Sequence, residues 1–543
     1  MKQAKRGGRG VADGFDLRDE PWIPVRLSGR SVRVGLRELF HRSHEIDDIE
    51  LPVPPAASGL LRILAAITAR VAHWEGERLG SEDLADSVDE WTTVRNGILA
   101  QRAFDPAAVD AYLDTEVPTG RFDLFHAERP FLQDPRLRAE CVDAQGKPNP
   151  SGVNKLVFGR PTGVNGAVLF GHFTDTQPIP VPAAEAVWHL IAQLYYGPSG
   201  QCTPRRITDA RAGNGDAGPL RKTVSFLPWA PDLFTTLVLA VPAPTDSADW
   251  EHEDRCPWEE DLANPLKPLP PATWPGRLLT GRARHAVLLA PSPDRQTVTD
   301  AFITWSTHEP AHAARDPFTI LDMPRNGGTP YARPADGQRA LWRDLDALLL
   351  KKTDSQAQRP SALEGLPSHL LPALRVRAYG FDQDGQQRDQ GWYEATTPPV
   401  LAWQQENNPQ MALHVARCHQ AAEDVADRLD YAARLAWKLA TDPGDDPQAK
   451  VKLDRKKPGP WLNTAMSHYW PAAENAFWDL TQHADYDAPV RLRFIESALQ
   501  ALDDALGASR ADIRVARARS RARAVLRALA RTSQTPHTSG SRP

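Results

Sequence analysis

Arginine side chains at helical spacing near the end of the chain are the residues most suited to a chemical task. Arg510, Arg514, Arg517 and Arg521 recur every three or four positions. On a helix that turns ~100° per residue they lie within about 60° of one another. Planar guanidinium groups bind phosphate oxygens in pairs, so this face is expected to contact several phosphates of a polyanion. The alternatives are a solvated helix face and an interface with an acidic protein.

A second basic cluster, KVKLDRKKPG, occupies residues 450–459 in a connection between two helical segments. Its lysines are Lys450, Lys452, Lys456 and Lys457. Ammonium groups there could provide further phosphate contacts, or the charge could simply keep an exposed loop soluble.

The sequence contains no pattern typical of an active site. GNGDAG at 213–218 matches G-x-G-x-x-G as a string, but a strand-like segment follows where a dinucleotide site requires a helix. The segment from Asp382 to Gly385 begins like a calcium loop and lacks the closing glutamate. The four cysteines form no C-x-x-C pair, which argues against a zinc site and a disulfide framework. We therefore expect no enzymatic activity, no metal and no cofactor.

The formal net charge of −5 conceals an uneven distribution. Residues 505–543 carry +8 and residues 1–14 carry +3, so residues 15–504 carry −16. Such a chain would bind a polyanion through separate patches. Arginine outnumbers lysine by 51 to 13, which suits phosphate recognition, although a GC-rich genome would give the same bias.

Nothing in the sequence is typical of a membrane or secreted protein. The basic segment 1–14 lacks the apolar stretch of a signal peptide, and no apolar run reaches the length of a membrane helix. We expect a cytoplasmic protein in which residues 1–14 are a disordered basic arm and residues 532–543 a disordered tail.

The elements that position these residues fall into two parts. Residues 15–400 contain a hairpin pattern around Ser28-Gly29-Arg30, a buried helix after Pro55, and the short apolar runs KLVFG, TVSFL, TLVLAV and HAVLLA, which we expect to be strands. Residues 401–531 contain four segments whose apolar residues step by three and four, with Pro471 expected to open one of them. The sequence predicts an α+β fold: a large, irregular N-terminal domain followed by a C-terminal four-helix bundle.

Two strings identify a related family. FDLRDEPWIPV at 15–25 and FDLFHAERPFLQD at 122–134, followed by the helical C-terminal part, resemble the CasA family, the large subunit of the type I-E CRISPR surveillance complex Cascade. The similarity is colinear over residues 15–531. It implies a noncatalytic antiviral subunit that recognises the protospacer-adjacent motif of double-stranded DNA from the minor groove and opens the duplex for guide RNA. The implied partners are guide RNA, the small and backbone subunits, target DNA and a helicase-nuclease, with no membrane.

The resemblance also implies site residues. The family's glycine loop resembles Gly197-Pro198-Ser199-Gly200, with Gly197, Ser199 and Gly200 expected at the DNA motif. Its glutamine wedge resembles Gln383, which we expect at the tip of a turn. Its flexible loop resembles residues 164–182, with the candidates Asn165, Val168, Leu169 and Phe170. The family's lysine finger would fall in residues 300–315, which contain no lysine, and His308 or Arg315 could substitute.

Two hypotheses of other classes remain. The chain could be a purely architectural subunit whose arginine helix binds an acidic protein, without DNA recognition. It could also be a metal-dependent nuclease or nucleotidyl enzyme, which would require clustered Asp, Glu or His that the sequence does not display.

Overall fold

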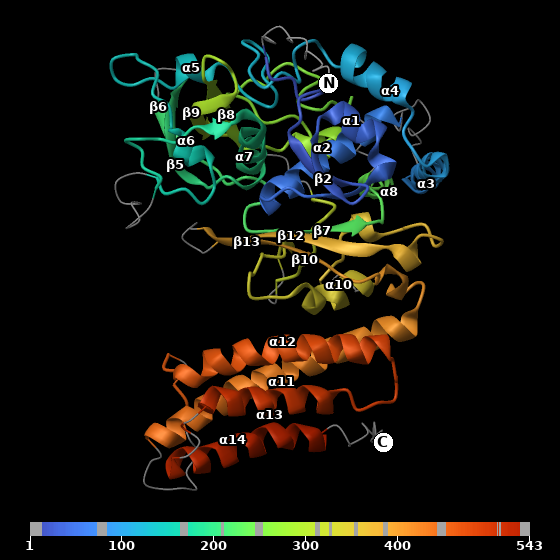
Figure 1. The fold of residues 1–543 in the computed structure, drawn as a ribbon, viewed down its shortest axis with the longest axis vertical. Coiled ribbons are helices and arrows are strands. Elements are labelled where there is room, and N and C mark those ends of the chain that lie inside the picture. The colour runs from blue at the N-terminus through green and yellow to red at the C-terminus, as the bar shows by residue number, and fades with distance from the viewer. Residues whose placement is uncertain are drawn as a thin grey trace, which may run out of the picture. The chain divides into compact units, whose positions relative to one another are not determined.

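The computed structural model describes residues 14–72, 84–162, 172–207, 211–244, 253–309, 315–324, 328–351, 357–383, 389–442, 452–454, 456–507, 509 and 512–532. The chain divides into two compact units. Unit 1 comprises Met1–Leu341 and Lys352–Leu401, and unit 2 comprises Trp342–Lys351 and Ala402–Pro543. Unit 1 mixes helices with small antiparallel sheets and unit 2 is helical (Figure 1), which confirms the predicted α+β class.

The N-terminal part of unit 1 contains the hairpin expected around Gly29. Strand β1 (Ile23–Leu27) pairs with β2 (Arg30–Val34) on one side and with β3 (Ile46–Ile49) on the other. The indole of Trp22 donates a hydrogen bond to the carbonyl oxygen of Leu17 at 2.9 Å. In the first of the two strings, the buried side chains of Phe15, Leu17 and Trp22 therefore anchor a partly exposed turn that leads into the first strand.

Helix α2 (Pro54–Val71) is the central element of unit 1, because all of its residues are buried. It packs against the helices α7, α8 and α9 and against strand β12. Arg62 of α2 is fully buried and forms an ion pair with Asp316, with 2.7 Å between Nη2 and Oδ1. An unpaired buried guanidinium would be strongly destabilising, so this pair is required to keep α2 inside the core.

The remaining sheets and helices of unit 1 surround α2. One sheet has the order β13-β12-β7, a second has the order β4-β9-β8, and two are pairs, β5-β6 and β10-β11. The strands are β4 (Val181–Pro182), β5 (Gly200–Arg206), β6 (Arg211–Gly215), β7 (Val224–Trp229), β8 (His285–Pro291), β9 (Thr297–Trp305), β10 (Leu321–Asp322), β11 (Tyr331–Ala332), β12 (Arg375–Gln383) and β13 (Asp389–Thr396). The α-helices are α1 (Leu36–His41), α3 (Leu84–Gln101), α4 (Pro106–Ala111), α5 (Leu137–Glu140), α6 (Val153–Leu156), α7 (Ala183–Tyr196), α8 (Leu233–Ala240) and α9 (Gly276–Thr280). Single turns of 3₁₀ or π-helix in unit 1 are η1 (Ser43–Glu45), η2 (Tyr112–Glu116), η6 (Ser361–Leu363) and η7 (Leu371–Ala373). Two more, η5 (Leu341–Asp344) and η8 (Leu401–Trp403), span points where the chain passes from unit 1 to unit 2.

Two of the four runs expected to be strands are wrong. KLVFG begins inside helix α6 and continues as a turn, and TLVLAV forms most of helix α8. The side chain of Asp232 caps α8 by accepting a hydrogen bond from the backbone N–H of Thr235 at 2.7 Å. Because α8 is buried nearly all round, its sequence shows no helical periodicity and resembles a buried strand. TVSFL and HAVLLA supply β7 and β8, as expected.

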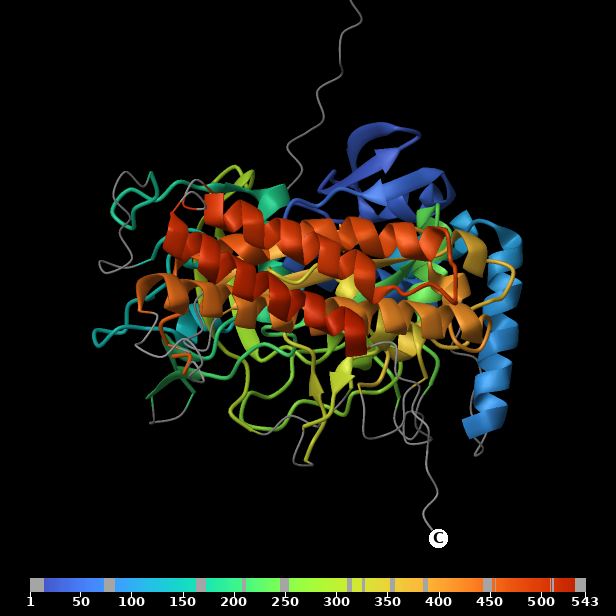
Figure 2. The same cartoon turned by 90° about the horizontal axis from the view of Figure 1, so that it is seen from below.

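Unit 2 consists mainly of four long helices that lie side by side (Figure 2). They are α11 (Pro409–Thr441), α12 (Pro460–Gln482), α13 (Arg491–Leu506) and α14 (Ile513–Thr532), and the short α10 (Leu345–Leu349) packs on α11. The expectation that Pro471 opens a helix is wrong, since Pro471 lies inside α12 and Pro460 occupies its first position. Helix α11 packs against each of the other three long helices. In the described part of the chain, no helix has the combination of length and apolar character that crossing a membrane requires.

Candidate nucleic-acid interface

The glycine loop, Gly197 to Gly200, connects helix α7 to strand β5 and requires its two glycines for different reasons. A Cβ atom on Gly197 would lie 2.6 Å from the carbonyl oxygen of Gln193 and 2.7 Å from Cε1 of His285. Gly200 has a φ of +106°, but an added Cβ would meet nothing within 4 Å. Gly197 is therefore required by close packing and Gly200 by backbone conformation, while the outer side of the loop is open.

His285 supports the glycine loop from beneath. Its Nε2 lies 3.0 Å from the carbonyl oxygen of Pro198. A carbonyl can only accept, so Nε2 carries the proton, and Nδ1 is buried without a hydrogen bond to any described residue. Burial lowers the pKa of His285 to about 4, a shift that the hydrogen bond to Pro198 only partly opposes. The imidazole is therefore a neutral packing and hydrogen-bonding group at neutral pH.

The segment 218–222 joins the glycine loop to the β12–β13 hairpin. The backbone N–H of Gly218 donates to the carbonyl oxygen of Gly197 at 2.9 Å. The backbone N–H of Lys222 donates to Oε1 of Gln383 at 3.2 Å. The structure therefore links the expected glycine loop and Gln383, which are far apart in sequence, through one short segment.

The expectation that Gln383 stands at the tip of a turn is wrong. Gln383 is the last residue of β12, and only 6% of its surface is exposed. Besides accepting from Lys222, its side chain donates through Nε2 to Oδ1 of Asp389 at 2.7 Å. Both ends of the amide are thus satisfied inside the molecule: β12 extends three residues beyond its pairing with β7, and this extension still pairs with β13, Gln383 opposite Asp389. Gln386 and Gln387, the neighbouring candidates, lie outside the described residues.

Two further expectations concern loops of unit 1. Asn165, Val168, Leu169 and Phe170 lie outside the described residues. In the region of the missing lysine finger, β9 ends at Trp305, and the exposed ring of His308 packs against the Trp305 indole in a tilted arrangement, with 4.0 Å between centroids. Arg315 is also exposed.

The arginine face of α14 is exposed in unit 2. Of the four expected phosphate ligands, Arg514, Arg517 and Arg521 have exposed side chains, and Arg510 lies outside the described residues. Two other arginines of α14 are engaged: Arg519 pairs with Asp503 at 2.6 Å, and Arg523 pairs with the same carboxylate. Burial alone would raise the pKa of Asp503, but these two guanidinium groups outweigh it and lower the pKa. From the sequence pattern alone, the two arginines that pair with Asp503 could not be told from the exposed Arg514, Arg517 and Arg521.

The lysine cluster is partly described. Lys452, Lys456 and Lys457 are exposed, and Lys450 lies outside the described residues. The backbone N–H groups of Lys456 and Lys457 donate to the side chain and the carbonyl oxygen of Asp454, at 2.9 Å and 3.2 Å. Because the side chains of these three lysines are exposed, their ammonium groups are accessible to solvent or to an anion.

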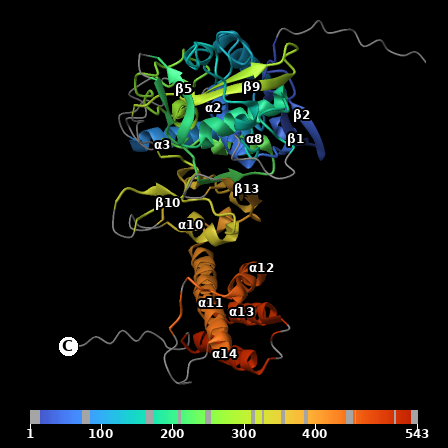
Figure 3. The ribbon, with the colours of Figure 1, turned by 90° about the vertical axis from the view of Figure 1, so that its left-hand side faces the viewer.

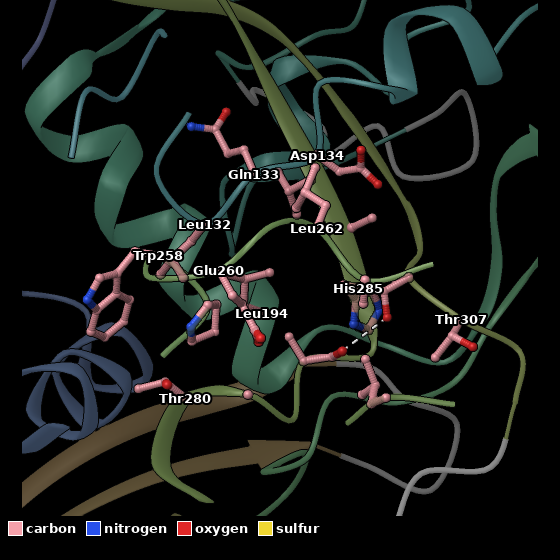
Figure 4. A pocket seen from close by; sticks show the side chains of 18 of the residues that line it. Leu132, Gln133, Asp134, Leu194, Trp258, Glu260, Leu262, Thr280, His285 and Thr307 are labelled. Carbon is pink, nitrogen blue, oxygen red and sulfur yellow. Dashed lines mark hydrogen bonds between the residues drawn. The ribbon is translucent and has the colours of Figure 1, made fainter. Parts of the chain in front are cut away.

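A cavity of about 160 Å³ lies beside β8 in unit 1 (Figure 4) and was not expected from the sequence. Leu132, Leu194 and Trp258 line it together with His285. Its charged groups are paired: Arg277 binds Glu260 at 2.6 Å, and Arg121 binds Asp261 at 2.7 Å. The hydroxyls of Thr280 and Thr307 donate to backbone carbonyl oxygens at 2.6 Å and 2.9 Å, so neither is activated by a base.

The described residues contain no group of three or more His, Cys, Asp or Glu side chains that could hold a metal ion. All four cysteines are free thiols. Burial raises the pKa of Cys141 and of Cys418 to about 12, so these thiols are unreactive at neutral pH.

Comparison with known proteins relates the chain to CRISPR-associated proteins. The family model described as "CRISPR-associated protein Cse1" matches residues 16–512. A CasA/Cse1 protein of Thermus thermophilus is 31% identical over 369 residues, an alignment that covers 66% of this chain and 65% of that protein. The chain thus spans just under two thirds of this curated relative in the alignment.

Solved structures give the same relation over more of the chain. A chain of a CRISPR RNA-guided surveillance complex is 39% identical, with a TM-score of 0.80, and the match covers 94% of this chain and 99% of that one. A second such complex, described as pre-nicking, is 38% identical with a TM-score of 0.72, covering 96% of this chain and 99% of that chain.

Proposed function

Since the chain belongs to the Cse1 family of CRISPR-associated proteins, we propose that it is the large subunit of an RNA-guided surveillance complex and recognises a short flanking motif in double-stranded DNA. It binds the motif from the minor groove and helps to open the adjacent duplex for guide RNA. The subunit performs no catalysis itself and recruits a helicase-nuclease. Its further partners are the guide RNA and the small and backbone subunits of the complex.

The glycine loop is the observation that carries this proposal. Its outer side is open at Gly200, and its inner side is held by the hydrogen bonds that His285 donates to the Pro198 carbonyl oxygen and Gly218 donates to the Gly197 carbonyl oxygen. A backbone without side chains can approach base edges in a groove about 6 Å wide, where most side chains would clash. Gln383 holds the β12–β13 hairpin beside this loop through Lys222, which supports a role for the hairpin in separating the strands.

The basic groups of unit 2 supply sequence-independent contacts in this proposal. Arg514, Arg517 and Arg521, with Lys452, Lys456 and Lys457, contact phosphates of the DNA strands. These contacts strengthen binding of every duplex, while the glycine loop selects among duplexes. A purely architectural subunit, with α14 bound to an acidic protein, is the alternative.

Duplex capture by the assembled complex tests the proposal. We expect Gly200→Asp to weaken capture of motif-bearing duplex roughly tenfold or more, because a carboxylate would face phosphates. Gly29→Asp is the matched control: Gly29 also has positive φ and open surroundings, and it lies in the β1–β2 turn, on the other side of unit 1 from β5 in Figure 3. Unchanged capture by Gly200→Asp, or a wild-type affinity that does not vary with salt, would favour the architectural alternative.

A further inference from the structure

The β5–β6 hairpin carries two amide side chains directly beside the glycine loop. In the antiparallel register, Gly200 pairs with Gly215, and the next pair is Gln201 with Asn214. Directly paired residues of an antiparallel ladder project from the same face, so the two amides are neighbours. Both residues are exposed. The amide pair is therefore next to the glycine pair in the ladder and projects from the opposite, exposed face of the hairpin.

The backbone beneath the amides is held in place. The indole Nε1 of Trp305 donates to the carbonyl oxygen of Ala212 at 3.1 Å, and Oγ1 of Thr304 donates to the carbonyl oxygen of Thr203 at 2.6 Å. Both bonds tie the hairpin to strand β9. The amides of Gln201 and Asn214 form no hydrogen bond to a described residue. The two amides thus lie on a hairpin whose backbone is fixed to β9, and they are accessible to a ligand.

The local charge also suits a nucleic acid. Asp216 follows the hairpin and would repel phosphates, but its carboxylate is paired with the guanidinium of Arg284. The amides themselves are neutral, so they do not favour phosphates over bases. Each amide provides a donor for adenine N3 or thymine O2 and an acceptor for the amino group of guanine, which are the groups that the minor groove presents.

We propose that Gln201 and Asn214 form hydrogen bonds to base edges of the flanking motif and determine which motif the complex prefers. The inference rests on the proposed function, because the glycine loop must first bring the minor groove to this surface. Gly200, where an added Cβ would meet nothing within 4 Å, leaves room for the duplex backbone at the end of the hairpin, and the amides distinguish A·T from G·C pairs. The ligand is a short stretch of B-form duplex, and recognition is direct.

Motif discrimination by the full complex tests this inference. The affinity of the complex, assembled with guide RNA, is measured on duplexes that differ only in the flanking base pairs. We expect Gln201→Ala with Asn214→Ala to reduce the ratio of affinities between preferred and disfavoured motifs roughly tenfold, the effect of losing one or two base contacts. Binding to target that is already opened should not change. Gln101→Ala is the control, since Gln101 is an exposed amide at the end of α3, across unit 1 from β5 in Figure 1.

The outcomes separate this inference from the proposed function. The role of the amides would be overturned, and the proposed function left standing, by either of two results. The double variant could lose the same affinity on all motifs, or it could keep the wild-type ratio of affinities while Gly200→Asp is still defective in capture. If Gly200→Asp also captured duplex normally, the proposed function itself would fail. Thermal denaturation of the double variant should match wild type, because both side chains are exposed and neither forms a hydrogen bond to the described part of the chain. A lowered melting temperature would also count against a recognition role.

Discussion

At the scale of single residues, Gly197 of the loop has no room for a methyl group. Gly197→Ala would place Cβ against the carbonyl oxygen of Gln193 and the His285 ring, and should lower the free energy of unfolding by about 1–3 kcal/mol. Gly97→Ala is a control of opposite sign, because Gly97 lies within α3 and an added Cβ meets nothing within 4 Å. It should stabilise the protein by about 0.5–1 kcal/mol. Denaturant unfolding of the isolated subunit measures both, and equal effects would contradict the packing role of Gly197.

Because His285 is buried as a neutral imidazole, we expect the protein to lose stability in mild acid. The pKa of this side chain is about 4 in the folded protein and near 6.5 when exposed, so between these pH values the unfolded chain binds the extra proton. Stability from this group is complete above pH 6.5 and is lost as the pH falls toward 4. The substitution His285→Gln should reduce the decrease in the free energy of unfolding between pH 7 and pH 4.5 by about 2 kcal/mol. His189, whose pKa burial also lowers to about 4, still titrates in both proteins, so the difference between them isolates His285.

The variant Gln383→Ala tests whether this side chain stabilises the β12–β13 hairpin or itself inserts into DNA. Gln383→Ala removes the partners of the Lys222 N–H and of Asp389, and should lower the free energy of unfolding by about 1–2 kcal/mol. Capture of closed duplex should weaken as the hairpin loosens, and capture of pre-opened target should not. A variant with normal stability and defective opening would instead indicate that the glutamine leaves its pocket and inserts as a wedge.

At the scale of elements, the arginine face of α14 predicts the salt dependence of DNA binding. Each phosphate contact contributes about 0.9 to the slope of log affinity against log salt concentration. Replacing Arg514, Arg517 and Arg521 by glutamine should reduce that slope by about 2 to 3 and weaken all duplexes alike. Arg428→Gln, an exposed position on α11, is the control. An unchanged slope in the triple variant would assign this face to a protein partner.

The elements also show what the sequence could and could not predict. The long helices α11 and α13 were expected because their apolar residues repeat at helical spacing, and the β1–β2 hairpin because its turn and alternation are local. Helix α8 was missed because it is apolar on nearly every side. The pairing of β7 with β12 joins residues near 227 to residues near 377, and no local pattern reveals such a partner.

The candidate site was predictable to a similar degree. The positions of Gly197 and Gly200 followed from the family resemblance, and the structure adds why each must be glycine. The surroundings of Gln383 could not be foreseen, because they depend on a hydrogen bond across 161 residues to Lys222. The amides of the β5–β6 hairpin were missed for the same reason, since only the register places Gln201 opposite Asn214.

At the scale of the whole molecule, the charge distribution agrees with selective rather than general DNA binding. Residues 15–504 carry a net −16 and the C-terminal 39 residues carry +8. An acidic body repels duplexes that make no specific contact, which would suit the proposed role of testing many sequences and retaining few. Replacing exposed acidic residues of unit 1 by their amides should increase retention of DNA that lacks the motif, and no increase would contradict this role.

The central claim is that the glycine loop acts on closed, motif-bearing duplex before guide RNA pairs. The most direct test is the rate of guide–target pairing in the assembled complex, measured on a closed duplex and on the same target with the first base pairs already opened. The account predicts that Gly200→Asp slows pairing on the closed duplex roughly tenfold or more and leaves the pre-opened target at the wild-type rate. Equal slowing on both targets, or no slowing on either, would contradict it.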